Sequence, residues 1–170
     1  MLFRRILVPH DFSDHATRAL KVAASLAAAH KGRVTVLHVI APFQPMTPFP
    51  VGEVAAWIPP ADLVTQERRT LEKLVTRTVG GRGALRVACQ VVVGDPFQRI
   101  VDAARSADSI VMATAGRTGL SHLLIGSVAE KVVRHSTVPV LTLRPGAARA
   151  KRASRRARAR GRRAGRRAAR

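Results

Sequence analysis

Two segments of this sequence carry residue types whose spacing suits chemistry. The first is Pro9-His10-Asp11, which follows the apolar run 5–9. A carboxylate at that place can accept hydrogen bonds from a sugar hydroxyl or an exocyclic amine. It can equally cap the helix that follows, since short polar side chains satisfy the free amides of a first helical turn. The residues give these two interpretations of Asp11 equal weight.

The second segment is the glycine-containing stretch 114–127. Gly116 and Gly119 lie near its start, and Gly126 and Ser127 close it. Glycines let backbone amides approach a phosphate, and a helix N-terminus adds unpaired donors and the positive end of its dipole. Ser127 can donate to a phosphate, act as the helix N-cap, or do both. Alone this is a weak sign of phosphate binding, because it matches neither the Walker motif nor GxGxxG.

Other reactive side chains form no recognisable group. The histidines lack the paired spacing of a metal site, and we expect most of them at the surface or in packing contacts; they are His10, His15, His30, His38, His122 and His135. The single cysteine, Cys89, excludes an internal disulfide framework and a multi-cysteine zinc site, and it fits a reducing cytosol. Its neighbours Val87 and Val91 predict that it is a buried small hydrophobe.

Alternating strands and helices must position these segments. Short apolar or β-branched runs predict five strands, and Ala- and Leu-rich or amphipathic stretches predict four helices. The strands are 5–9, 33–39, 85–93, 109–113 and 139–143, and the helices are 16–30, 62–78, 97–106 and 127–135. Ser13 or Asp14 can cap the first helix, and residues 41–60, with six prolines, form a long irregular connection.

This order predicts an α/β fold: a single Rossmann-like three-layer domain with a five-stranded, mainly parallel sheet and helices on both faces. Ligands of such sheets bind beyond the carboxyl ends of the strands, where the strand order reverses. Pro9-His10-Asp11 and the stretch 114–127 both fall at that edge.

The net charge of +20 is unevenly distributed. Residues 147–170 hold twelve Lys or Arg and no acid, which leaves +8 on residues 1–146. We expect residues 1–146 to form the domain and residues 147–170 to be a disordered Arg/Ala-rich tail, because such dense like charge repels itself. We expect the tail to bind the phosphates of DNA or RNA without sequence specificity. The residues expected to do so are Lys151, Arg152, Arg155, Arg156, Arg158, Arg160, Arg162, Arg163, Arg166 and Arg167.

The domain resembles the universal stress protein family over essentially its whole length. The resemblance is carried by residues 5–13, Val36-Leu-His-Val39, Gly94-Asp-Pro96, residues 110–133 and Pro139-Val-Leu141. Nucleotide-binding members show Gly, two residues, Gly, nine residues, then Gly followed by Ser or Thr. Here the first glycine is replaced by Ala113, and position 115 is Ala as well. Because Ala113 ends a predicted strand, we expect a negative φ there and retained binding.

The resemblance implies a pocket for ATP or a related adenine nucleotide. Asp11, beside Pro9, would contact the adenine or ribose, and the Val39 backbone and the Gly94 turn would flank the adenine. The phosphates would lie against Ala113, Gly116, Gly126 and Ser127, with Arg117 as a further candidate. Magnesium could bridge the phosphates, although no carboxylate cluster is dedicated to it.

No nucleophile is paired with a base, so nucleotide binding without efficient turnover is expected, with weak ATP hydrolysis or self-phosphorylation at Ser127 left open. The resemblance also implies a homodimer through the last strand, at Val140, Leu141, Thr142 and Leu143. The alternative is a nucleic-acid-binding protein whose domain is a nucleotide-free dimerisation scaffold, an interpretation that Ala113 and Ala115 favour. No signal peptide or membrane span is evident, which predicts a cytoplasmic protein, with nucleoid association through the tail.

Overall fold

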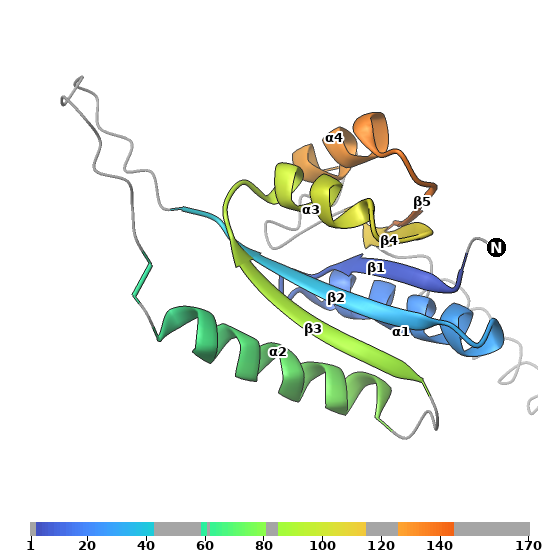
Figure 1. Ribbon diagram of the computed structural model, residues 1–170, viewed down its shortest axis with the longest axis horizontal. Helices are drawn as coiled ribbons and strands as arrows, with labels where there is room; N and C mark the ends of the chain where they lie inside the picture. The colour runs from blue at the N-terminus through green and yellow to red at the C-terminus, as the bar shows by residue number, and fades with distance from the viewer. Residues whose placement is uncertain (1–2, 43–58, 61, 81–84, 115–125, 145–170) are drawn as a thin grey trace, which may run out of the picture.

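The computed structural model describes residues 3–42, 59–60, 62–80, 85–114 and 126–144. Strands and helices alternate along this part of the chain (Figure 1). The strands are β1 (Arg5–Pro9), β2 (Arg33–Ile40), β3 (Arg86–Val93), β4 (Ser109–Ala113) and β5 (Val140–Leu143). The helices are α1 (Asp14–Ala29), α2 (Leu63–Val79), α3 (Pro96–Ala104) and α4 (Ser127–His135). None of the described helices is long and apolar enough to cross a membrane.

The described strands form one parallel sheet in the order β3-β2-β1-β4-β5. The chain moves outward from β1 to β2 and β3, then returns to add β4 and β5 on the other side. The strand order therefore reverses beside β1, between β1 and β4. The predicted α/β fold with a five-stranded parallel sheet is confirmed.

Helices cover both faces of the sheet because the strand side chains alternate between two apolar layers. Ile6 and Val8 of β1 pack with the buried faces of α1 and α2, whereas Leu7 packs with α3 and α4. The Figure 1 view shows α3 and α4 together on one side of the sheet and α1 and α2 on the other. This arrangement is the three-layer domain that the sequence predicts.

The helix starts follow local capping chemistry. Ser13, one of the two predicted caps, is the N-cap of α1, and its hydroxyl accepts from Ala16 N at 3.1 Å. Asp95 caps α3 by accepting from Gln98 N at 2.9 Å, with Pro96 as the first helical residue. Helix α3 ends at Ala104 rather than at the predicted residue 106.

Two expectations about other segments have different outcomes. Cys89 on β3 is only half-buried, because β3 is an edge strand of the described sheet and its neighbours Ala88 and Gln90 are exposed; the prediction of a buried cysteine is wrong. Most of the predicted long connection, residues 43–58, lies outside the described residues.

Candidate functional site

A cavity of about 300 Å³ opens at the carboxyl end of the sheet. It lies between β1 and β4, at the point where the strand order reverses, which is where open α/β sheets bind ligands. The β1–α1 turn, the end of β2, the end of β4 and the first turn of α4 supply most of its walls. It is lined by Pro9, His10, Asp11, Ala16, His38, Val39, Pro96, Ile100, Met112, Ala113, Thr114, Gly126, Ser127, Val128 and Ala129.

Asp11 lies in the turn between β1 and α1 and reaches the cavity wall. Its Oδ1 accepts a hydrogen bond from Ser13 N at 3.0 Å, which fixes the turn just before the helix. Ser13, not Asp11, is the N-cap of α1, so the interpretation of Asp11 as the helix cap is wrong. Its carboxylate is held by the turn at the cavity instead.

Two buried histidines hydrogen-bond to the backbone of this turn. His10 is 3% exposed and His38 is 6% exposed, and His38 Nδ1 donates to the His10 carbonyl at 2.7 Å. His10 Nδ1 accepts from Phe12 N at 3.0 Å, and His10 Nε2 lies 3.3 Å from Thr17 Oγ1. The Thr17 hydroxyl donates to Ser13 O, so His10 Nε2–H is the donor in that contact and the ring is neutral.

Burial lowers the pKa of His10 from 6.5 to about 4, with the nearby His38 lowering it further and Asp11 opposing the shift. A neutral His10 keeps Nδ1 available for Phe12 N. That bond supports Phe12 in the left-handed region, at a φ of 66°, an uncommon backbone conformation for a non-glycine residue. The Phe12 ring in turn packs on His38, with 4.4 Å between ring centroids.

The first turn of α4 faces the cavity and has no side-chain cap within the described residues. Gly126 is the N-cap and Ser127 is the first helical residue, so the interpretation of Ser127 as the N-cap is wrong. The amides of Ser127, Val128 and Ala129 belong to the turn whose N–H groups an α-helix leaves unpaired. Together with the helix dipole they make a site suited to a phosphate or another anion.

Gly126 holds this helix end close to β4. Its N–H donates to Thr114 O at 2.6 Å, and the Thr114 hydroxyl donates to Leu143 O at 3.2 Å. A Cβ added to Gly126 would lie 3.1 Å from Thr114 O, which is tighter than an ordinary contact. A larger side chain would therefore push α4 away from the strand.

Most of the sequence-predicted binding residues meet at this cavity. Its lining includes Pro9, Asp11, Val39, Ala113, Gly126 and Ser127. Gly94 is not in the lining, although Pro96, two residues later, is. Ala113 is not among the described residues with positive φ, which confirms the expected backbone geometry. Gly116 and Arg117 lie outside the described residues.

The sequence predicted no binding role for five of the cavity residues, although His10 and Thr114 lie in the two segments it singled out; the five are His10, His38, Ile100, Met112 and Thr114. His10 and Thr114 each follow directly after a strand, and that position is the signal that could have identified them. His38 and Ile100 depend on how distant elements pack. In the described part of the chain, no group of three or more His, Cys, Asp and Glu side chains is placed to hold a metal ion.

Comparisons with known proteins agree with this geometry. A family model described as the universal stress protein family matches residues 2–144. A universal stress protein of Methanocaldococcus jannaschii is 33% identical over 147 residues, which cover 84% of this chain and 83% of the relative.

Two solved structures show the same fold. A universal stress protein of Lactobacillus plantarum has a TM-score of 0.68 and 24% identity, with 85% of this chain and 99% of that one covered. A universal stress protein of Archaeoglobus fulgidus, solved in complex with dAMP, has a TM-score of 0.58 and 25% identity, with 84% and 98% covered. The fold, the switch-point cavity and the family match lead to one conclusion: the chain belongs to the universal stress protein family.

Proposed function

We propose that this universal stress protein binds an adenine nucleotide, foremost ATP, in the cavity between β1 and β4, and acts as a regulator in a stress response. The observation that carries the proposal is the uncapped N-terminus of α4, which opens into the same cavity as the Asp11 carboxylate. The first supplies donors for phosphate and the second an acceptor for a ribose hydroxyl or an adenine amine. The dAMP complex of the Archaeoglobus fulgidus relative supports this ligand class.

In the proposed arrangement, the phosphates lie against the amides of the first turn of α4 and beside Ala113. The base lies among the apolar side chains of Val39, Ile100 and Met112, which line the cavity. Gly116 and Arg117 complete the phosphate-binding loop in this proposal, and Gly94 supports the turn behind Pro96. A Mg²⁺ ion would enter on the phosphates, since the described residues offer it no cluster of carboxylates.

We propose binding rather than turnover. Among the described side chains of the cavity, no nucleophile is hydrogen-bonded to a base: Ser127 is exposed, and both ring nitrogens of His10 are engaged by Phe12 and Thr17. A bound nucleotide would then change the shape or partners of the protein instead of being consumed.

The Gly126→Val substitution tests the site. Its Cβ would lie 3.1 Å from Thr114 O, so the first turn of α4 should shift by a few tenths of an ångström and ATP affinity should fall by at least about tenfold, or about 1.4 kcal/mol. Ala88→Val is the matched control, because Ala88 is exposed on edge strand β3 and does not line the cavity. Equal ATP affinity in Gly126→Val and Ala88→Val would refute the site. Equal weak binding by wild type and both variants would support the nucleotide-free scaffold instead.

We also propose that residues 147–170 form a separate polycationic arm for nucleic acid. The support is composition: twelve basic residues and no acid in a segment that lies outside the described residues. If about eight of these charges meet phosphates, log affinity should fall with log salt at a slope of roughly −7 on duplex DNA. Gel shifts comparing the full chain with residues 1–146 test the arm, and an unchanged salt slope after truncation would count against it.

A further inference from the structure

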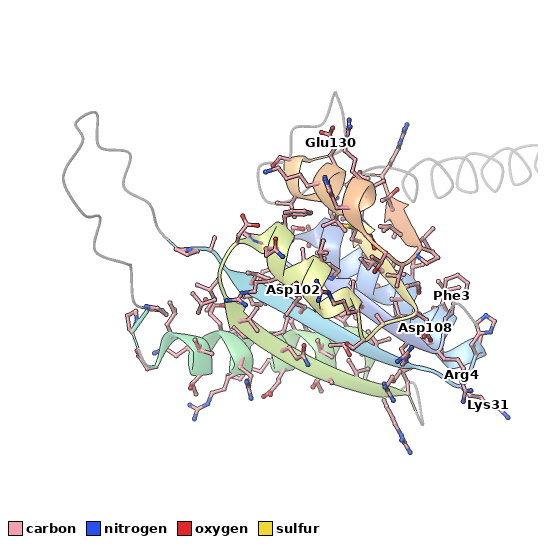
Figure 2. The ribbon with its side chains drawn as sticks, turned by 45° about the horizontal axis from the view of Figure 1, so that its top comes forward. Phe3, Arg4, Lys31, Asp102, Asp108 and Glu130 are labelled. Carbon is pink, nitrogen blue, oxygen red and sulfur yellow. The ribbon has the colours of Figure 1, made fainter. Side chains whose placement is uncertain are left out.

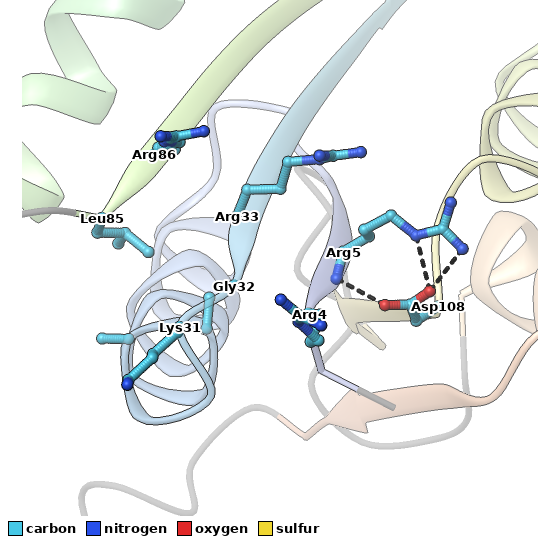
Figure 3. A pocket seen from close by; sticks show the side chains of 10 residues that line it. Arg4, Arg5, Lys31, Gly32, Arg33, Leu85, Arg86 and Asp108 are labelled. Atoms are coloured by element: carbon cyan, nitrogen blue, oxygen red, sulfur yellow. Dashed lines mark hydrogen bonds and ion pairs between the residues drawn. The ribbon is translucent and has the colours of Figure 1, made fainter. Parts of the chain in front are cut away.

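A second cavity, of about 980 Å³, opens at the opposite end of the sheet from the nucleotide cavity. It lies at the amino ends of β1, β2 and β3, beside the end of α1 (Figure 3). Its charged lining residues are Arg4, Arg5, Lys31, Arg33, Arg86 and Asp108. We call the five basic residues of this set the arginine edge. Figure 2 shows Arg4, Lys31 and Asp108 gathered at this end of the molecule.

The sheet register builds the centre of the arginine edge. Arg5, Arg33 and Arg86 are the first residues of β1, β2 and β3, and Arg33 is the direct register partner of both Arg5 and Arg86. Register partners of parallel strands point to the same face, here the face that carries α3. Neighbouring strands are ~4.8 Å apart, so the three Cα atoms form a row about 10 Å long. All three residues are exposed.

Two further cations are brought to this row by a close approach of the chain. The carbonyl of Arg4 accepts from Arg33 N at 2.7 Å, which fixes Arg4 beside the start of β2. A Cβ on Gly32 would lie 2.7 Å from that same carbonyl, so only glycine lets the α1–β2 turn pass this close. Lys31, with a φ of 51°, precedes Gly32 in the turn and is exposed.

Little negative charge offsets this cluster. Asp108 binds Arg5 through three contacts: Arg5 N to Oδ2 at 2.8 Å, Nε to Oδ1 at 2.8 Å and Nη2 to Oδ1 at 2.7 Å. The Arg5 side-chain hydrogen bond holds the pKa of Asp108 below its usual range, so Asp108 stays ionised and offsets one charge. Three carbonyls of the last turn of α1 already accept from the backbone N–H groups of the following residues; they are those of Leu26, Ala27 and Ala28.

Within the described part of the chain, four cations of the edge therefore have no counter-ion. Arg4, Lys31, Arg33 and Arg86 make no side-chain hydrogen bond or ion pair with another described residue. Figure 3 shows Arg4, Arg33 and Arg86 at the starts of the strands and Lys31 beside the end of α1, while the dashed lines join only Arg5 and Asp108. Like charges held this close repel one another, and an anion that bridges them would relieve the repulsion.

We propose that the arginine edge binds the phosphate backbone of a nucleic acid, independently of the nucleotide cavity and of the basic tail. Protein–nucleic acid interfaces are polar and strongly positive, whereas a protein partner would need an apolar centre to its contact. The exposed large hydrophobic residues of the described chain, Val133 and Leu141, lie elsewhere, on α4 and β5.

The form of the site also indicates the form of the ligand. Among the described residues, the lining contains no aromatic side chain, and Phe3, directly before Arg4, packs its ring on His30 with 5.7 Å between centroids. This favours contacts to a duplex backbone over stacking with an unpaired base. It also contains no buried polar side chain that could fix the orientation of one small molecule, and its cations are exposed. An extended polyanion fits these features better than a second free nucleotide.

A matched pair of full-length variants tests the proposal. The edge variant is Lys31→Gln/Arg33→Gln/Arg86→Gln. The control is Arg69→Gln/Lys73→Gln/Arg77→Gln, which removes the same charge from the exposed face of α2. Binding of a labelled DNA duplex, and of an RNA duplex of the same sequence, is measured by fluorescence anisotropy over a range of salt concentrations. The edge variant should have a salt slope shallower by about 2 to 3, because three phosphate contacts are lost, whereas the control keeps the wild-type slope.

Two results would overturn the proposal. The first is an equal change of slope in the edge and control variants, which would mean that net charge alone matters. The second is unchanged duplex binding and salt slope in the edge variant; if its binding of inorganic tripolyphosphate is weakened at the same time, the edge binds a small anion instead. ATP titrations of the same variants keep the test separate from the proposed nucleotide site, because the edge lies at the other end of the sheet and ATP affinity should not change.

Discussion

At the scale of single residues, His10 links the chemistry of the cavity to its shape. Both of its ring nitrogens are used, one as acceptor for Phe12 N and one as donor to Thr17. The carbonyl of the same residue accepts from His38 Nδ1. A neutral His10 thus organises the turn that presents Asp11 to the cavity. Protonation of Nδ1 would remove the acceptor for Phe12 N and place a charge in a buried position.

This predicts an acid-sensitive stability. Because the pKa of His10 falls from 6.5 in the unfolded chain to about 4 in the fold, the unfolded state binds more protons between these values. Protonation of His10 therefore favours the unfolded state. The free energy of unfolding is not reduced by this residue above pH 6.5, and it decreases as the pH falls toward 4. The total decrease in the free energy of unfolding is on the order of 3 kcal/mol, because each unit of pKa shift corresponds to about 1.4 kcal/mol.

His10→Asn provides the comparison, because an amide oxygen can still accept from Phe12 N but does not titrate in this range. Chemical denaturation at neutral pH and near pH 4.5 should show that wild type loses about 2 kcal/mol more unfolding free energy than the variant. Other acidic groups titrate equally in both proteins and cancel. Parallel losses in wild type and His10→Asn would show that His10 is not the titrating group.

At the scale of elements, the sequence predicts the strands and helix starts that depend on local residue patterns. Apolar runs located every described strand, and Ser13 and Pro96 located two helix starts within two residues. The parallel sheet with helices on both faces also agrees with the predicted fold, whereas the strand order itself was not predicted. Six of the predicted cavity residues meet for the same reason: parallel strands place all of their following loops at one edge of the sheet.

Features that depend on strand register or on the packing of distant elements could not be predicted from a sequence pattern. His10 and His38 are neighbours only because His10 N pairs with Leu37 O and extends the register of β1 and β2. The arginine row exists only because Arg5, Arg33 and Arg86 begin their strands at the same level. The N-cap of α4 is Gly126, one residue before the predicted Ser127. The hydrogen bond from Gly126 N to Thr114 O fixes this start of the helix, and it depends on contact with the end of β4.

At the scale of the whole molecule, the sheet separates three surfaces. The cavity between β1 and β4 lies at the carboxyl ends of the strands, the arginine edge lies at the amino ends of β1 to β3, and β5 lies at one lateral edge of the described sheet. A dimer formed through β5 would leave both arginine edges uncovered. Two such edges in one particle would strengthen nucleic-acid binding through multivalency.

The family resemblance implies a dimer through β5, and we propose this interface because no other described strand pairs with the outer edge of β5. Leu141 is 40% exposed at the middle of β5, flanked by the half-buried residues Val140, Thr142 and Leu143. A bare edge of this kind pairs readily with another chain. The wild-type protein should therefore sediment at twice the mass of the 18.3 kDa chain, and Leu141→Arg should sediment as a monomer.

The control for this experiment is Val133→Arg. Val133 is the other exposed large hydrophobic residue of the described chain, 44% exposed, but it lies on α4 and not on the strand edge. The Val133→Arg substitution therefore introduces the same charge at a similarly exposed position without changing β5. The Val133→Arg protein should stay dimeric. A monomeric wild type, or a dimer that only Val133→Arg dissociates, would move the interface away from β5. A dimer disrupted by Leu141→Arg alone would establish that the last strand joins the two copies, because Leu141 lies on β5 and Val133 does not.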